Sequence, residues 1–136
     1  MPVHFSGELV GTNSTKLFHG PSGSSILTTA PVDNGGDGSQ FSPTDLCAVS
    51  LGACALTIMG MFCAKNNILM DGIRFDLEKE MSDSTPRRIA KLTVNFYLKT
   101  NCSEQDFKRV VGAGKTCPVR HSLLKDIEVV ENYSRT

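Results

Sequence analysis

Five cysteines are the residues of this chain best suited to chemistry. They are Cys47, Cys54, Cys63, Cys102 and Cys117. An odd number at wide spacing is not typical of a structural disulfide framework. There is no Cys-x-x-Cys pair, and the three histidines do not fall at zinc-binding spacing. The cysteines are therefore either buried core residues or reactive thiols.

Cys117 stands at the start of a predicted helix, in the stretch TCPVRHSLL. Pro118 suits the first helical position, which makes Cys117 the N-cap. The unpaired N–H groups and the positive dipole end would stabilise a thiolate there, so we expect a pKa below the free value of about 8.5. His121, one turn further on, would add positive charge if protonated. The alternatives are that Cys117 is a poor cap at a tolerated position and His121 a surface residue.

Cys54 lies in a long apolar segment, where burial raises the pKa of a thiol. Taken alone, it is interpreted as a buried core residue more readily than as a reactive thiol. Cys47 falls on the same stripe of the segment, Cys63 falls on the opposite one, and Cys102 precedes a helix cap. The residues by themselves therefore rank Cys117 as the nucleophile and leave Cys54 undecided.

A long helix must position Cys54. Ser42 is the predicted N-cap, Pro43 the first helical residue and Asp45 the acidic residue that closes a capping box. Nothing breaks the pattern from there to about residue 66, and the segment is apolar on almost every side. Such a helix is normally buried nearly all round. We therefore expect a central helix of about 24 residues, wrapped by a sheet or by a second subunit.

The rest of the chain predicts an α+β domain that spans residues 1–136. Short strands are expected at 4–10, 16–19 and 24–29, followed by an exposed flexible loop at 32–40. Alternating residues predict a hairpin of strands 73–81 and 88–100. Ser103 caps a short helix that ends at Gly112 and Gly114, and a last strand is expected at 127–133.

Composition excludes several classes of function. The 136 residues carry 14 basic and 14 acidic side chains, and this balance argues against nucleic acid or an anionic membrane as partner. No apolar run reaches the roughly 18 residues of a membrane span, because the longest, around Ala53 to Ala64, is interrupted by Thr57 and Gly60. The first residues lack the features of a signal peptide. These observations predict a cytoplasmic protein.

Two motifs resemble those of the OsmC/Ohr family, the osmotically inducible and organic hydroperoxide resistance proteins. The first is the helix opening Pro43-Thr44-Asp45-Leu46, followed eleven residues after the proline by Cys54 in a Gly-Ala-Cys triplet. The second is Cys117-Pro118-Val119. The order of elements is also similar over nearly the whole chain, including Pro86-Arg87 at the opening of the second long strand.

The resemblance implies an OsmC-like fold: antiparallel sheets around a buried central helix, in an intertwined homodimer. It also implies a thiol peroxidase without metal or bound cofactor. In that chemistry Cys54 attacks the peroxide and becomes a sulfenic acid, Cys117 resolves it as a disulfide, and an external dithiol, for example of the lipoyl type, restores both thiols. The family thus gives Cys117 the second role, whereas the residues alone gave it the first.

The activating cation departs from the family pattern. The Ohr branch uses an arginine from the N-terminal strands and a glutamate just after the helix-opening proline. Here that glutamate position is Thr44, and no arginine precedes Arg74. Asp45 matches the acidic residue of the OsmC and OsmC-like branches. Arg87 is predicted to supply the charge by pairing with Asp45 or a thiolate, and the alternative is that it lies on the surface at a strand edge.

Three hypotheses remain at this stage. The first is a homodimeric peroxidase that uses Cys54 and Cys117, with Asp45 and Arg87 in support. The second is a thiol-bearing binding or redox-sensing protein on the same fold, with little turnover. The third, an acyl-transfer enzyme built on Cys117 and His121, requires an orienting group and an oxyanion hole that the sequence does not reveal.

Overall fold

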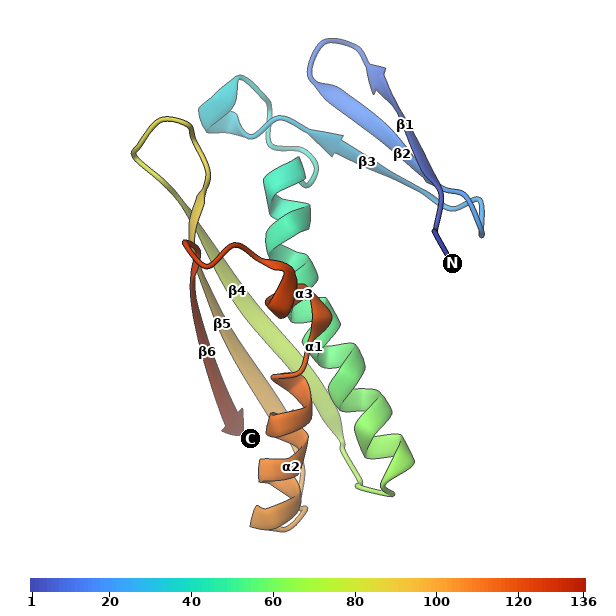
Figure 1. Cartoon of the computed structure of the whole chain (residues 1–136), viewed down its shortest axis with the longest axis vertical. Helices are drawn as coiled ribbons and strands as arrows, with labels where there is room; N and C mark the ends of the chain where they lie inside the picture. Colours follow the sequence, from blue (N-terminus) through green and yellow to red (C-terminus); the bar gives the residue numbers. More distant parts are fainter. The chain divides into compact units, whose positions relative to one another are not determined.

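A computed structural model describes all residues, 1–136, of the chain. The chain divides into two compact units, Met1–Cys47 and Ala48–Thr136, and each is described by itself. The long helix α1 (Pro43–Lys65) begins in the first unit and continues into the second (Figure 1).

The first unit is built on an antiparallel meander. Its strands are β1 (Phe5–Val10), β2 (Ser14–His19) and β3 (Ser25–Thr29), paired in the order β1-β2-β3. Gly11 and Gly23 have φ of 67° and 74° in the two connecting turns, a conformation that favours glycine. The predicted strands are confirmed to within two residues. The predicted loop at 32–40 contains one short 3-10 turn, η1 (Val32–Asn34).

The start of α1 is confirmed as a capping box. The backbone N–H of Asp45 donates to Ser42 Oγ at 3.1 Å, and the N–H of Ser42 donates to Asp45 Oδ2 at 2.9 Å. These two hydrogen bonds satisfy backbone N–H groups that would otherwise have no partner at the start of the helix. The sequence pattern therefore located this helix terminus correctly.

The second unit contains a three-stranded sheet covered by helices. The strands are β4 (Gly72–Met81), β5 (Ile89–Lys99) and β6 (Glu128–Arg135), in the order β4-β5-β6. The hairpin of β4 and β5 is antiparallel, as predicted, but β6 runs parallel to β5, so this sheet is mixed rather than wholly antiparallel. Two helices, α2 (Glu104–Gly114) and α3 (Pro118–Ser122), connect β5 to β6 and carry the chain back along the sheet.

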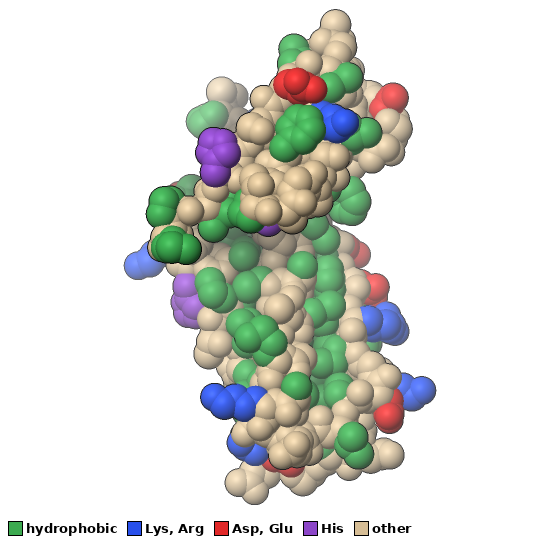
Figure 2. All heavy atoms as spheres, turned by 90° about the vertical axis from the view of Figure 1, so that its right-hand side faces the viewer, with side chains coloured by type: hydrophobic (Ala, Val, Ile, Leu, Met, Phe, Trp, Pro, Cys, Tyr) green, Lys and Arg blue, Asp and Glu red, His purple; other side chains and the backbone are tan.

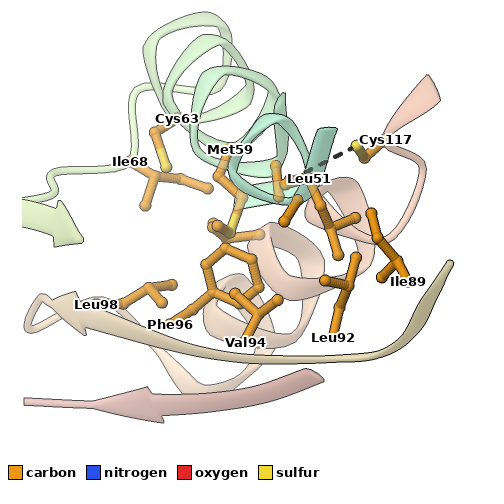
Figure 3. Close-up of a cluster of buried hydrophobic side chains, with 13 residues drawn as sticks. Leu51, Met59, Cys63, Ile68, Ile89, Leu92, Val94, Phe96, Leu98 and Cys117 are labelled. Carbon is orange, nitrogen blue, oxygen red and sulfur yellow. Dashed lines mark hydrogen bonds between the residues drawn. The ribbon is translucent and has the colours of Figure 1, made fainter. Parts of the chain in front are cut away.

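The hydrophobic core of the second unit lies between α1 and the inner face of β5. Leu92, Val94, Phe96 and Leu98 alternate along β5 and are fully buried. Figure 3 shows them pointing toward Leu51 and other side chains of α1. This packing fixes which face of α1 turns inward, and it therefore also fixes the direction of Cys54.

The chain alone covers only one side of α1, which differs from the expectation of burial nearly all round. Its inner side includes Ala48, Ala55 and Cys63, which are buried, whereas Met61 is 62% exposed. Figure 2 looks onto the side of the molecule on which α1 lies, and hydrophobic side chains gather along this face of the Ala48–Thr136 unit. An apolar helix face without cover is typical of an interaction surface.

The expectation that no segment reaches the length of a membrane span was wrong for α1. The helix has 23 residues and a window of mean hydropathy 2.1, so it is long and apolar enough to cross a membrane. The interruptions at Thr57 and Gly60 do not lower its hydropathy enough to fail that criterion. A core helix meets the same criterion, and α1 packs on a sheet through its buried side.

Candidate functional site

The thiols of Cys54 and Cys117 are neighbours, near enough for Cys54 to raise the pKa of Cys117. Cys54 lies in the middle of α1, half-buried and packed against the core, while Cys117 precedes α3 and is fully buried. The Cys117 Sγ also approaches the carbonyl oxygen of Leu51, at 4.0 Å, drawn as a dashed line in Figure 3. Both cysteines are free, so the pair is in its dithiol form.

The environment of Cys117 corrects one sequence prediction. The residue is the N-cap of α3, as expected, but burial raises the pKa of its thiol, and the neighbouring Cys54 thiol raises it further. The backbone N–H groups of Arg120 and Val119 act in the opposite direction and do not outweigh burial. The helix terminus therefore does not lower the pKa of Cys117, contrary to the expectation from sequence.

Close packing of α1 on the sheet explains the glycine before Cys54. Gly52 is buried, and a Cβ added at this position would overlap the ring of Phe75 on β4. Only glycine allows the helix to approach the strand this closely. The Gly-Ala-Cys triplet therefore sets the distance between the Cys54 turn and the sheet.

Sequence reasoning missed a polar cluster beside Cys117. Arg120 Nε bonds Glu131 Oε1, and the hydroxyl of Tyr133 donates to Glu131 Oε2 at 2.7 Å. Burial raises the pKa of Tyr133, and the hydrogen bond to Glu131 adds to that effect. One signal was available: Glu131 and Tyr133 alternate with exposed Asn132, so the acid lies on the inner face of the strand.

The other two predicted site residues are Asp45 and Arg87. Asp45 closes the capping box of α1, and Arg87 lies exposed in the loop between β4 and β5. Both take part in further interactions. Their predicted role in activating a thiol therefore stays a prediction.

His121 does not pair with Cys117. Its ring is exposed, and Nε2 lies 3.3 Å from the carbonyl oxygen of Lys115. An acyl-transfer mechanism requires the imidazole to take a proton from the thiol. The pair that the third hypothesis requires is therefore not formed.

A second pair of thiols lies toward the end of α1. Cys63 is buried, and burial raises the pKa of its thiol, with a smaller contribution from neighbouring Cys102. Cys47 is exposed. No group of three or more histidine, cysteine or acidic side chains is arranged to hold a metal ion.

Comparison with known proteins gives the same fold and family. The model of the OsmC-like protein family matches residues 36–132. The solved structure of a Psychrobacter arcticus 273-4 protein, named for osmotic stress induction and a detoxification response, is similar at 32% identity and a TM-score of 0.88, covering 96% of this chain and 94% of that one. A search of curated protein sequences finds no significant match.

Two more distant structures carry names that refer to peroxide. An organic hydroperoxide resistance protein OsmC from Legionella pneumophila has 14% identity and a TM-score of 0.75, covering 98% of this chain and 97% of that one. The organic hydroperoxide resistance protein OhrB of Bacillus subtilis has 13% identity and a TM-score of 0.67, covering 98% of both chains. At this identity they share the fold. The extent of the family-model match and the similarity to the Psychrobacter protein show that the chain belongs to the OsmC-like protein family.

Proposed function

We propose that the protein is a two-cysteine peroxidase that reduces organic hydroperoxides, with hydrogen peroxide as a further substrate, in the response to oxidative stress. The observation that carries the proposal is the contact between the thiols of Cys54 and Cys117. One member of the pair is accessible and the other is buried behind it. The names of the Legionella and Bacillus relatives support the same class of substrate.

The reaction has three steps. The thiolate of Cys54 attacks the distal peroxide oxygen; an S–O bond forms, the O–O bond breaks, and the alkoxide takes a proton to leave as an alcohol. The Cys117 sulfur then attacks the Cys54 sulfur; the S–S bond forms, and hydroxide leaves as water with the proton of the Cys117 thiol. An external dithiol, for example of the lipoyl type, reduces the disulfide by exchange and becomes oxidised.

The difference in accessibility between the two thiols supports these roles. A peroxide can reach Cys54, which is half-buried, more readily than Cys117, which is fully buried. The raised pKa keeps Cys117 a thiol until a sulfenic acid forms beside it. This order protects the resolving cysteine from direct oxidation.

Peroxide consumption tests this function. The reduced protein with cumene hydroperoxide and dihydrolipoamide should consume peroxide, and Cys54→Ser should abolish turnover. The matched control is Cys47→Ser, because Cys47 lies on the same helix and is exposed. Equal rates for wild type and Cys54→Ser would reject the proposal.

A redox-sensing role is the alternative, and the absence of the Ohr-branch activating pair favours it, because Thr44 stands at the glutamate position and no arginine precedes Arg74. A sensor would form the disulfide stoichiometrically but turn over slowly with any dithiol. The ratio of peroxide consumed to protein separates the two: many equivalents support the enzyme, and a single equivalent supports the sensor.

Substitution of Arg87 tests whether this residue supplies the positive charge that activates the Cys54 thiol. If Arg87 pairs with Asp45 or the thiolate, Arg87→Ala should slow the first oxidation step by about tenfold. Arg88→Ala is the control, because Arg88 neighbours it and bonds the carbonyl of Ile89 at 3.1 Å. Equal rates for the two variants would place Arg87 outside the mechanism.

The proposal includes a cytoplasmic homodimer. A second copy would cover the apolar face of α1 that includes exposed Met61. Light scattering should give twice the chain mass, and Met61→Glu should weaken the dimer by placing a charge in that interface.

A further inference from the structure

The polar cluster beside the thiol pair carries a further inference, which rests on the proposed function. The cluster consists of Arg120 on α3 and of Glu131 and Tyr133 on β6. We propose that Glu131 is a positioning residue: it holds α3 on the sheet and thereby holds Cys117 against Cys54.

The helix α3 requires an anchor outside itself. It has five residues, and helices this short are not stable on their own. Cys117 makes no side-chain hydrogen bond as its N-cap, and the helix ends at Leu123 in extended backbone. The position of the Cys117 sulfur therefore depends on contacts between α3 and the rest of the fold.

Glu131 supplies such a contact with both of its carboxylate oxygens. Its side chain is only 6% exposed. One oxygen accepts from the Arg120 guanidinium on α3, and the other accepts from the Tyr133 hydroxyl. Hydrogen bonds to a charged group are strong, and a buried charge that loses its partner is costly. Displacing α3 would therefore leave a nearly buried carboxylate without its cation.

A row of aromatic rings connects this anchor to α1. Tyr133 stacks on Phe96 at 4.7 Å, and Phe96 meets Phe75 at 6.3 Å, each pair being in register across the sheet. The ring of Phe75 lies against Gly52, two residues before Cys54. This row links Tyr133, beside the anchor, to the strand on which α1 packs.

This arrangement predicts which chemical step depends on Glu131. Formation of the sulfenic acid involves Cys54 on α1, whose place is set by the core. Formation of the disulfide requires the Cys117 sulfur to reach the Cys54 sulfur opposite the leaving oxygen. Loosening α3 should therefore slow the second step and leave the first unchanged.

The first experiment measures the accessibility of Cys117 in the reduced full-length chain. Glu131→Gln should raise the rate at which iodoacetamide labels Cys117 by about tenfold, as followed by mass spectrometry. Glu128→Gln is the matched control on the same strand, because Glu128 is exposed and pairs with Lys91 at 3.9 Å. Equal labelling in the two variants would overturn the proposal.

The second experiment separates the two steps in a single turnover with cumene hydroperoxide. In Glu131→Gln, trapping of the Cys54 sulfenic acid should keep its rate within about twofold, while disulfide formation slows by about tenfold. Arg120→Lys should preserve the second step because a lysine can still pair with Glu131, and Arg120→Met should slow it. Equal slowing of both steps would indicate a general loss of structure and reject the positioning role.

The test does not depend on a single variant or on peroxidase activity. If Glu131→Gln does not fold, the same labelling measurement is made on Arg120→Met, because the Arg120 side chain is 38% exposed. Faster labelling of Cys117 supports the anchor, and wild-type labelling overturns it. A wild-type protein that consumes no peroxide would reject the proposed function, while the labelling experiment would still decide whether Glu131 holds Cys117.

Discussion

The two pairs of thiols along α1 differ in what surrounds them. Each pair joins a buried thiol, Cys117 or Cys63, to a half-buried one, Cys54 or Cys102. Burial raises the pKa of both buried thiols, and the neighbouring cysteine raises it further. Only at Cys117 do backbone N–H groups, those of Arg120 and Val119, oppose part of the rise. Nearby donors, rather than accessibility, therefore distinguish the pair of Cys54 and Cys117.

The largest expected difference between the pairs is in turnover. Cys54→Ser should lower peroxide consumption by at least about a hundredfold, because serine does not form a sulfenic acid. Cys102→Ser, in the second pair, should stay within about twofold of wild type. A large loss of peroxide consumption in Cys102→Ser would contradict this difference, since it would mean that the second pair takes part in the reaction.

The next largest effect concerns the packing of α1 on β4, next to the pair of Cys54 and Cys117. Gly52→Ala should lower the free energy of unfolding by about 1–3 kcal/mol, because the new methyl overlaps the ring of Phe75. Gly112→Ala on α2 is the control, since a Cβ there meets nothing within 4 Å, and it should leave stability unchanged or slightly higher. Urea unfolding measures both, and equal stabilities would contradict the close approach of α1 to β4.

The capping box should contribute less. Asp45→Ala removes an acceptor at 2.9 Å from the Ser42 N–H and should cost about 1 kcal/mol of stability. Asp106→Ala, at the corresponding position in the first turn of α2, is a matched comparison, because Ser103 caps that helix through the Asp106 N–H, which alanine retains. If Asp45→Ala leaves stability unchanged and instead lowers turnover, its role is in the chemistry rather than in the cap.

The smallest effect is the dependence of stability on pH. Burial raises the folded-state pKa of both Cys63 and Cys117 above the unfolded value of about 8.5. The stabilisation by the neutral thiols is complete below that value and is lost as the pH rises toward the folded pKa, because the unfolded chain then binds fewer protons. The free energy of unfolding of the reduced protein should therefore fall above about pH 8.5. Cys63→Ala should reduce that slope, and an unchanged slope would contradict it.

Local patterns predicted the elements well. The cap at Ser42, the alternation along β5 and the Ser103 cap each depend on residues close in sequence, and all three are confirmed. The position of β6 was harder, because parallel pairing depends on how α2 and α3 return the chain.

The candidate site was only partly predictable, for the same physical reason. The N-cap position of Cys117 follows from Pro118, but its burial depends on Leu51 and Cys54, more than 60 residues earlier in the chain. The bond between Arg120 and Glu131 likewise joins a helix to a strand, and neither residue forms a motif by itself. Contacts of this kind are set by tertiary packing.

The most direct test of the central claim is to map the disulfide formed by one equivalent of cumene hydroperoxide. The reduced protein is treated, alkylated and digested without reductant, and its cross-linked peptides are identified by mass spectrometry. We expect a bond between Cys54 and Cys117, with Cys63 and Cys102 recovered as alkylated thiols. A disulfide between Cys63 and Cys102 while Cys54 stays reduced would contradict it.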